Sequence, residues 1–197
     1  MNFNHKAVDC LVLHADMVPE KNAKTIKYKN PKLIKEQRSL EPLDSNAIRV
    51  EIIYAGICGT DIHVVKTNQE GFISTSAPLS IPENGRIIGH EGVGKILEVG
   101  QDVRDLKPGD YVALESLITC GHCESCLRGY LNQCLNVKLI GMQFNGIFAN
   151  IADVPETVAV ANTGATVSTV TVKALDASET LPAASVSVAT KLVAPSA

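Results

Sequence analysis

The sequence contains the run Cys120-Gly-His-Cys123-Glu-Ser-Cys126-Leu-Arg-Gly-Tyr-Leu-Asn-Gln-Cys134. Intervals of two, two and seven residues let the four thiols converge on one tetrahedral zinc ion, with zinc–sulfur distances of about 2.3 Å. Two disulfides are the alternative, but nothing in the chain suggests export, and cysteines this close more often bind metal in a cytosolic protein. We predict a structural zinc lobe over 116–138. Because four thiolates leave no position open for substrate, any chemistry must lie elsewhere.

Length and composition exclude several classes of function. A chain of 197 residues forms one ordinary domain with part of a second. A hydrophobic fraction of 45%, a charged fraction of 20% and a net charge of -3 are those of a soluble globular protein. They give no indication of nucleic acid or membrane as a partner, so a small molecule is expected. No apolar run could span a bilayer or serve as a secretory signal, and we expect a cytoplasmic protein.

Short strands separated by turns predict a mainly β fold, either a barrel or a sandwich. The clearest strand is 47–54, Ala-Ile-Arg-Val-Glu-Ile-Ile-Tyr, whose apolar and polar residues alternate with period two. Among apolar neighbours, Cys10 is expected to be a small buried hydrophobe. We predict a surface loop over 67–84. Further strands are expected over 6–13, 24–28, a glycine-rich pair within 86–100, 111–114 and 139–154.

A cysteine and a histidine outside the lobe form a second candidate metal site. Cys58 and His90 carry the soft thiolate and the imidazole that zinc prefers, and a catalytic site needs three protein ligands with a fourth position open. Alone, the pair is better explained as a buried cysteine and a hydrogen-bonded histidine. The surrounding residues favour the metal, because Gly89 and Gly94 permit close backbone approach and Glu91 adds a carboxylate.

The turn around Cys58 adds groups suited to proton transfer. Gly56 and Gly59 permit a sharp turn, after which Thr60 or Asp61 is expected to cap a short helix. A hydroxyl at Thr60 and an imidazole at His63 near a metal-bound oxygen would make a proton path. The Asp61 carboxylate could orient one of the imidazoles.

Four motifs in order resemble the medium-chain zinc-dependent alcohol dehydrogenase family. They are Cys58-Gly-Thr60-Asp61-x-His63, Gly89-His90-Glu91-x-x-Gly94-x₅-Gly100-x-x-Val103, Lys107-Pro-Gly109-Asp110-x-Val112 and the four-cysteine lobe. The resemblance covers about 45–160. It implies a GroES-like β-barrel catalytic domain over 1–160, with a zinc-knuckle lobe and few short helices, to which the family adds a Rossmann domain for NAD(P).

The resemblance also implies roles for individual residues. Cys58 and His90 would bind a catalytic zinc ion, with Glu91 as an outer or alternative ligand, and Thr60 and His63 would relay the proton from the substrate hydroxyl to solvent. Zinc would lower the pKa of the bound alcohol, which then gives hydride to nicotinamide. The substrate would be a small alcohol, polyol or sugar.

The chain departs from the family after residue 160. No Gly-x-Gly-x-x-Gly follows a predicted strand, so we expect no Rossmann domain within these 197 residues, and NAD(P) would require one to be supplied. The tail over 161–197 is predicted either as a strand over 165–174 and a helix over 178–193, or as a weakly specified end. In some relatives a cysteine follows the Leu-Pro pair found here at 181–182, where this chain has Ala183. The third ligand would then be Glu91, water, Asp176 or Glu179.

These patterns predict the catalytic domain of a zinc-dependent alcohol or polyol dehydrogenase, with little activity as an isolated chain. The alternative is a non-enzymatic zinc-binding module that acts by self-association or by pairing with a partner. In that case an open edge of the barrel would serve as the contact, because unpaired strand edges pair readily and permit a homo-oligomer.

Overall fold

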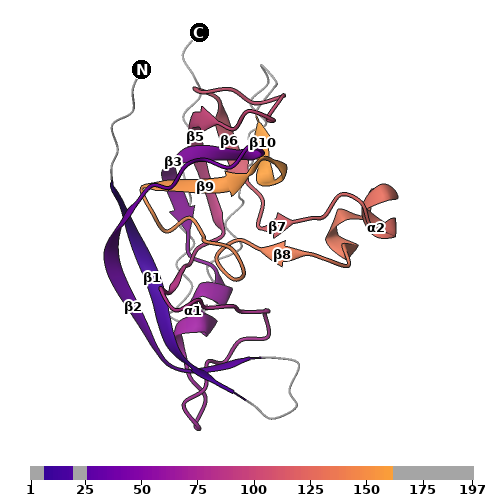
Figure 1. Cartoon of the computed structure of the whole chain (residues 1–197). Coiled ribbons are helices and arrows are strands. Elements are labelled where there is room, and N and C mark those ends of the chain that lie inside the picture. Colours follow the sequence, from indigo (N-terminus) through magenta and orange to yellow (C-terminus); the bar gives the residue numbers. More distant parts are fainter. Residues whose placement is uncertain (1–6, 20–25, 162–197) are drawn as a thin grey trace, which may run out of the picture.

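The computed structural model describes residues 7–19 and 26–161, and in this part the chain is mainly β, as predicted. Its first sheet has the strand order β2-β1-β4, formed by β1 (Ala7–Val18), β2 (Lys27–Ser39) and β4 (Arg86–Ile87). β1 and β2 make a long antiparallel ribbon along one side of the molecule (Figure 1). β4 pairs with β1 and leads directly into the segment that carries His90.

The second sheet holds most of the core and has the order β10-β6-β5-β3-β9. Its strands are β3 (Ala47–Gly56), β5 (Glu91–Val99), β6 (Tyr111–Leu114), β9 (Ile151–Pro155) and β10 (Ala159–Ala161). All of its pairs are antiparallel. A short 3-10 helix, η2 (Glu156–Val158), connects β9 to β10.

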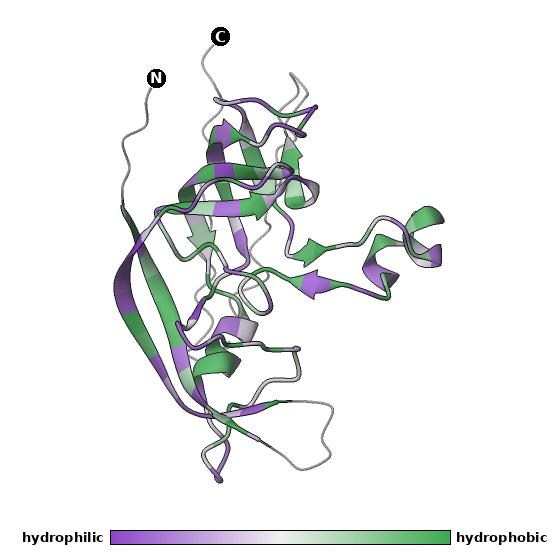
Figure 2. Cartoon of the chain, viewed as in Figure 1, coloured by the Kyte–Doolittle hydropathy of each residue, from purple (hydrophilic) through white to green (hydrophobic). Residues whose placement is uncertain are grey.

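Buried and more exposed residues alternate along these strands, and the buried ones form the core. Ile48 and Val50 of β3 are fully buried, and they pack with Ile96 of β5, Val112 of β6 and Val154 of β9. Green and purple segments alternate along the same strands in Figure 2. Burying a branched side chain of this size contributes about 1.5–3 kcal/mol. This cluster therefore fixes the register of the sheet on which the candidate site is built.

The remaining elements form a short helix and a projecting lobe. The helix α1 (Gly59–Val65) follows β3 directly. The lobe begins and ends with a two-stranded sheet, β7 (Leu117–Ile118) and β8 (Lys138–Leu139), and contains α2 (Glu124–Leu127) and η1 (Leu131–Gln133). It stands out from the body of the molecule (Figure 1). Among the residues described, no helix has the length and apolar character needed to span a membrane.

The structure corrects several sequence-based expectations about strands. The second strand is Lys27–Ser39 rather than 24–28, and the pair expected within 86–100 is split between the two sheets. The region 139–154 is mostly turns between β8 and β9. Within the expected surface loop, Ile73, Leu79 and Ile81 pack against a buried cluster.

Other expectations are confirmed, or they concern residues that the structure does not describe. The strands over 47–54 and 111–114 are confirmed as β3 and β6. Cys10 is buried, with 3% of its surface exposed. Beyond Ala161 the tail is not described, so the strand over 165–174, the helix over 178–193 and the candidate ligands Asp176 and Glu179 lie outside the described residues, as does Ala183. The domain boundary at residue 160 stays a prediction.

Candidate metal centres

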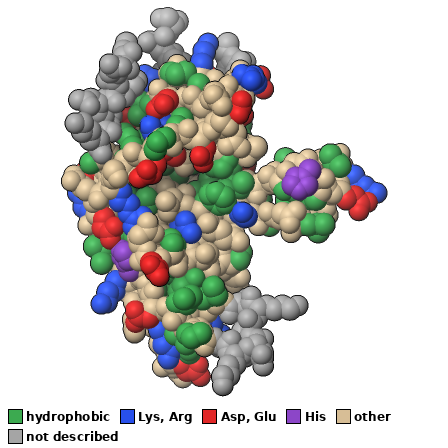
Figure 3. Space-filling view, in the orientation of Figure 1, with side chains coloured by type: hydrophobic (Ala, Val, Ile, Leu, Met, Phe, Trp, Pro, Cys, Tyr) green, Lys and Arg blue, Asp and Glu red, His purple; other side chains and the backbone are tan. Residues whose placement is uncertain are grey.

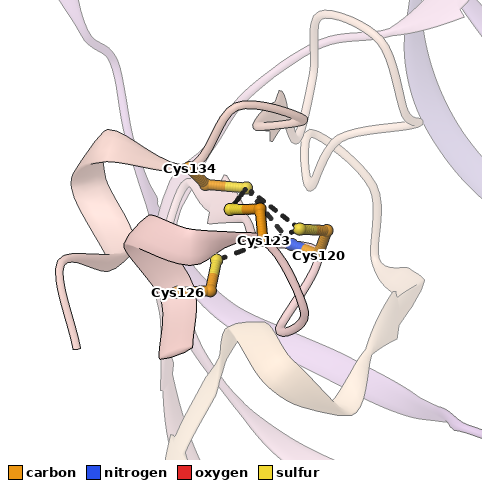
Figure 4. A group of neighbouring side chains, drawn as sticks. All are labelled: Cys120, Cys123, Cys126 and Cys134. Carbon is orange, nitrogen blue, oxygen red and sulfur yellow. Dashed lines mark hydrogen bonds between the residues drawn. The ribbon is translucent and has the colours of Figure 1, made fainter. Parts of the chain in front are cut away.

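The four lobe cysteines converge on one point. Sγ–Sγ distances are 3.6 Å for Cys120–Cys134 and 4.0 Å for both Cys120–Cys126 and Cys123–Cys134. All four sulfurs lie within 4.8 Å of one another and point inward (Figure 4). Tetrahedral zinc with bonds of about 2.3 Å to sulfur separates its ligands by about 3.8 Å. The donor set and its spacing therefore fit a structural zinc ion.

Amide groups of the lobe donate hydrogen bonds to its sulfur atoms. The backbone N–H groups of Cys120 and Asn136 both donate to Sγ of Cys134 at 3.4 Å. A backbone N–H of His122 is the main cause that lowers the pKa of Cys120 to about 5. Burial instead raises the pKa of Cys126 to about 12. Because a metal ligand must be a thiolate, binding would release the proton of Cys126.

The second cluster is assembled by strand register. β3 ends at Gly56, which pairs with Glu91 at the start of β5. Cys58 follows β3 by two residues and His90 precedes β5 by one, so the same register brings their side chains together. One donor atom each from Cys58, His90 and Glu91 lie within 4.8 Å of one another. The structure thus brings Cys58 together with His90 and Glu91, which follow it in sequence by 32 and 33 positions.

Glycine is required beside His90 for steric reasons. Gly89 has a φ of +90°, a conformation that other residues rarely adopt, and a Cβ there would lie 2.3 Å from the ring of Phe148. The backbone N–H of Ile147 donates to the Gly89 carbonyl at 3.0 Å, and that of Phe148 to Ile88 at 2.9 Å. These bonds hold the chain that presents His90.

Asp61 joins the two parts of the second cluster. Its Oδ2 accepts a hydrogen bond of 2.9 Å from the backbone N–H of Cys58, which is the N-cap of α1. Neither Thr60 nor Asp61 is the N-cap itself; Asp61 caps from the third helical position. Its Oδ1 lies 3.5 Å from Nδ1 of His90. At that distance the two form an ion pair rather than a hydrogen bond, and both atoms are buried without a hydrogen-bond partner among the described residues.

The buried Asp61 carboxylate controls the charge of the imidazole. It is the largest cause that raises the pKa of His90 to about 9, against the lowering effect of burial. Nδ1 faces Asp61, while Nε2 lies 4.0 Å from Oε1 of Glu91. Nε2 is therefore the nitrogen available to a metal ion, and binding would displace a proton from the ring. The soft and borderline donors of Cys58 and His90, with one carboxylate, fit zinc.

Comparison with known proteins gives the family. Residues 44–163 match the alcohol dehydrogenase GroES-like domain, which covers more than half of the chain. The chain belongs to this family. An L-threonine 3-dehydrogenase from Pyrococcus abyssi is 37% identical over 108 residues, which are 55% of this chain and 29% of that protein. The chain thus spans less than a third of the length of such curated relatives.

Solved structures agree with this alcohol dehydrogenase GroES-like assignment. One assigned as an alcohol dehydrogenase from Thermotoga maritima superposes with a TM-score of 0.70 at 25% identity, covering 78% of this chain and 44% of that one. Galactitol-1-phosphate dehydrogenase from Escherichia coli superposes with a TM-score of 0.56 at 27% identity, covering 78% and 37%. The GroES-like fold expected from the motifs is confirmed.

Within this GroES-like domain the predicted proton-transfer residues lie on α1. The Thr60 hydroxyl lies 3.8 Å from Sγ of Cys58, whereas His63 is exposed three residues further along the helix. Sequence reasoning missed the bond from Asp61 to the Cys58 backbone and the amides around Cys134. An acidic residue at the third helical position is a sequence signal for the first of these. The amide contacts have no such signal, because every residue except proline carries a backbone N–H.

Proposed function

We propose that this chain is the catalytic domain of a zinc-dependent alcohol or polyol dehydrogenase, formed by residues 1–160. The observation that carries the proposal is the cluster of Cys58, His90 and Glu91, with donor atoms within 4.8 Å of one another. Such a mixed donor set with three protein ligands leaves room for a substrate oxygen, unlike four thiolates. The lobe cysteines would hold a second, structural zinc ion.

Each residue has a defined task in this proposal. A bound zinc ion would supply Lewis acidity, which lowers the pKa of a substrate hydroxyl. Cys58 and His90 would hold the ion, and Asp61 would fix the orientation of the His90 ring through Nδ1. Thr60 would take the proton of the substrate hydroxyl while it passes its own hydroxyl proton on. His63, on the same face of α1 three residues later, would receive that proton and release one to solvent.

The hydride acceptor is the part this proposal takes from the family. Oxidation of an alcohol to a carbonyl releases a proton from the hydroxyl group and a hydride from carbon. We propose that NAD(P), held by a Rossmann domain, accepts the hydride. The described residues contain no nucleotide-binding fold of this kind. We therefore expect little dehydrogenase activity from the 197-residue chain alone.

The relatives support a proposed class of substrate, and the cysteines support a proposed location. The relatives named above act on threonine and on galactitol 1-phosphate, both of which carry secondary or primary hydroxyl groups. We propose a small alcohol, polyol or sugar as the substrate. All six cysteines are free thiols, which favours a reducing compartment such as the cytoplasm.

Metal stoichiometry tests the proposal. The chain is stripped, reloaded with zinc and measured by atomic emission, and we expect two zinc ions per chain. His90→Ala should bind one, because only the second cluster loses a ligand. His122→Ala is the matched control. This exposed lobe histidine belongs to neither candidate metal cluster, so two ions should remain. One ion in the unsubstituted chain would contradict a catalytic site.

A steady-state assay tests the expected lack of activity. The reloaded chain is incubated with NAD⁺ or NADP⁺ and a panel of alcohols that includes threonine and galactitol 1-phosphate. Turnover on the order of 1 s⁻¹, which is ordinary for an enzyme, would refute the need for an added Rossmann domain.

The second candidate is a zinc-binding module that acts by association. It is favoured by the exposed edge of β2, where Leu33 and Ile34 are each 44% exposed. Unpaired strand edges are templates for pairing with another chain. One zinc ion per chain together with a stable dimer in size-exclusion chromatography would favour this function over the dehydrogenase.

A further inference from the structure

Arg86 of β4 is buried although it carries a formal charge. It is 9% exposed, and burial lowers the pKa of its guanidinium group. Its hydrogen bonds within the described part of the chain go to uncharged acceptors. Nε donates to the backbone carbonyl of Ser80 at 2.9 Å, and Nη1 donates to Oδ1 of Asn145 at 3.2 Å. An apolar side chain would fill this space without the cost of burying a charge, so the guanidinium indicates a need for its rigid fork of donors.

The two acceptors belong to irregular segments that are far apart in sequence. Ser80 lies in the loop before β4, and Asn145 lies in the turn over 140–146. The two segments also bond each other, because the backbone N–H of Ser80 donates to the carbonyl of Met142 at 3.0 Å. Arg86, the loop and the turn therefore form a closed triangle of contacts. A planar guanidinium holds two acceptors in fixed directions, which the flexible ammonium group of lysine does not.

The same turn lies directly against the peptide that precedes His90. A Cβ at Gly141 would come within 2.8 Å of the Gly89 carbonyl oxygen, and a Cβ at Gly146 would come closer still. The backbone N–H of Gly146 also donates to the carbonyl of Ile87 at 2.7 Å. Backbone meets backbone here with no side chain between them. A shift of the turn would therefore be passed on to the chain that presents His90.

The turn also contacts the helix on the other side of the second cluster. Met142 is buried in one hydrophobic cluster with Val64 of α1 and with Ile88. Asp61, also on α1, has its Oδ1 3.5 Å from Nδ1 of His90. The position of the turn therefore affects the spacing between the imidazole and the helix that faces it.

We propose that Arg86 is a positioning residue for the second metal cluster. Its guanidinium fixes the loop and the turn, and the turn fixes the backbone that presents His90 to Cys58 and Asp61. This inference rests on the zinc site proposed above. Arg86 acts on the cluster through Ser80 and the turn, so its loss should weaken metal binding without removing a donor atom.

Cobalt titration of the metal-stripped chain tests this role, and His90→Ala identifies the absorption that belongs to the second cluster. Arg86→Met removes the donors, and Arg86→Lys keeps the charge without the fork. Both should raise the Kd of the second cluster for cobalt about tenfold, which is the lower end of the loss expected when a group that holds a ligand is removed. The lobe stands clear of the main mass (Figure 3), so it should fill with cobalt as in the unsubstituted chain. An unchanged Kd in Arg86→Met, or full recovery in Arg86→Lys, would overturn the proposal.

Arg49→Met is the matched control for a loss of stability alone. The Arg49 side chain is 12% exposed on β3, and it bonds Glu98 and Asp153 at 2.8 Å each. Its loss should lower Tm, as the loss of Arg86 should, but it should leave the Kd of the second cluster unchanged. If Arg49→Met raised this Kd as much as Arg86→Met does, metal affinity would follow overall stability and the proposal would be wrong.

A double-mutant cycle tests the path through the turn. Asn145→Ala removes the acceptor of Nη1 and should raise the same Kd about tenfold. Arg86→Met combined with Asn145→Ala should also give about a tenfold rise, because both changes break the same connection. A rise of about 100-fold would show that the two residues act independently, which contradicts the proposed path. A single metal ion in the unsubstituted chain would refute the proposed zinc site itself, and this inference with it.

Discussion

The two candidate metal clusters of this chain are built in opposite ways. The lobe takes its four candidate ligands from 15 consecutive residues, Cys120 to Cys134, and buries two of its sulfur-bearing residues within the lobe itself. The second cluster takes its candidate ligands from the end of β3 and the start of β5, and its positions depend on the register of a five-stranded sheet. The difference teaches that metal should organise the lobe, whereas the sheet should organise the second site.

Loss of a lobe ligand should give the largest effect. In Cys126→Ser the lobe loses one of its four candidate zinc ligands, and little apolar core remains to hold 120–136 folded. Because zinc binding supplies on the order of 10 kcal/mol in small zinc domains, we expect amide exchange in this segment to accelerate by about 10³-fold or more. Hydrogen exchange by mass spectrometry measures it.

Amide exchange outside the lobe should not respond to this substitution. Amides of β3 and β5 should keep their protection in Cys126→Ser, since their core cluster does not involve the lobe cysteines. Acceleration spread evenly over the lobe and the body would show that the lobe does not fold as a separate unit.

Asp61→Asn should affect the second cluster alone. The amide can still accept the bond from the Cys58 N–H, but it removes the negative charge 3.5 Å from Nδ1 of His90. Loss of such a supporting carboxylate lowers metal affinity about 10- to 100-fold. Cobalt titration, followed by its visible absorption, would show the weaker site, while the lobe site should fill as before. Equal weakening of both sites would contradict their independence.

The sequence predicted the lobe better than the second cluster because the lobe is local. Cysteine spacing alone predicts its candidate ligands, and their sulfurs do converge. No local pattern shows that Gly56 pairs with Glu91, so from the residues alone Cys58 and His90 were a candidate pair favoured by their neighbours, and the family resemblance added the expectation of a catalytic zinc site. Glycine at position 89 was expected to permit close approach, and the ring of Phe148 against it shows why.

The strands, too, were predicted well only where a local sequence pattern marks them. β3 was predicted because its alternation reflects one buried face. β2 was predicted poorly because it is an edge strand whose residues are mostly exposed, so it has no apolar period to detect. The loop over 67–84 was expected on the surface, yet Ile73 and Leu79 pack against Val64 of α1 and neighbouring core residues. Irregular backbone conceals such burial, because no periodicity relates its apolar residues.

Gly94→Ala should perturb the body and the second cluster. A Cβ at this position would lie 2.3 Å from Cγ1 of Val50 and 2.5 Å from the carbonyl oxygen of Glu51. Overpacking of this kind costs about 1–3 kcal/mol, which corresponds to a fall in Tm of roughly 2–12 °C for a chain of this size. Thermal unfolding by circular dichroism measures it. An unchanged Tm would show that β3 and β5 separate without cost.

Gly59→Ala should give the smallest effect and is the matched control for Gly94→Ala. Gly59 follows Cys58 directly and begins α1, and a Cβ there meets nothing within 4 Å. Alanine also restricts the unfolded chain, so we expect stability to rise by up to about 1 kcal/mol. Zinc content should stay the same at both centres. If Gly59→Ala instead removed the second metal ion while Gly94→Ala retained it, the tight turn rather than the sheet register would position Cys58.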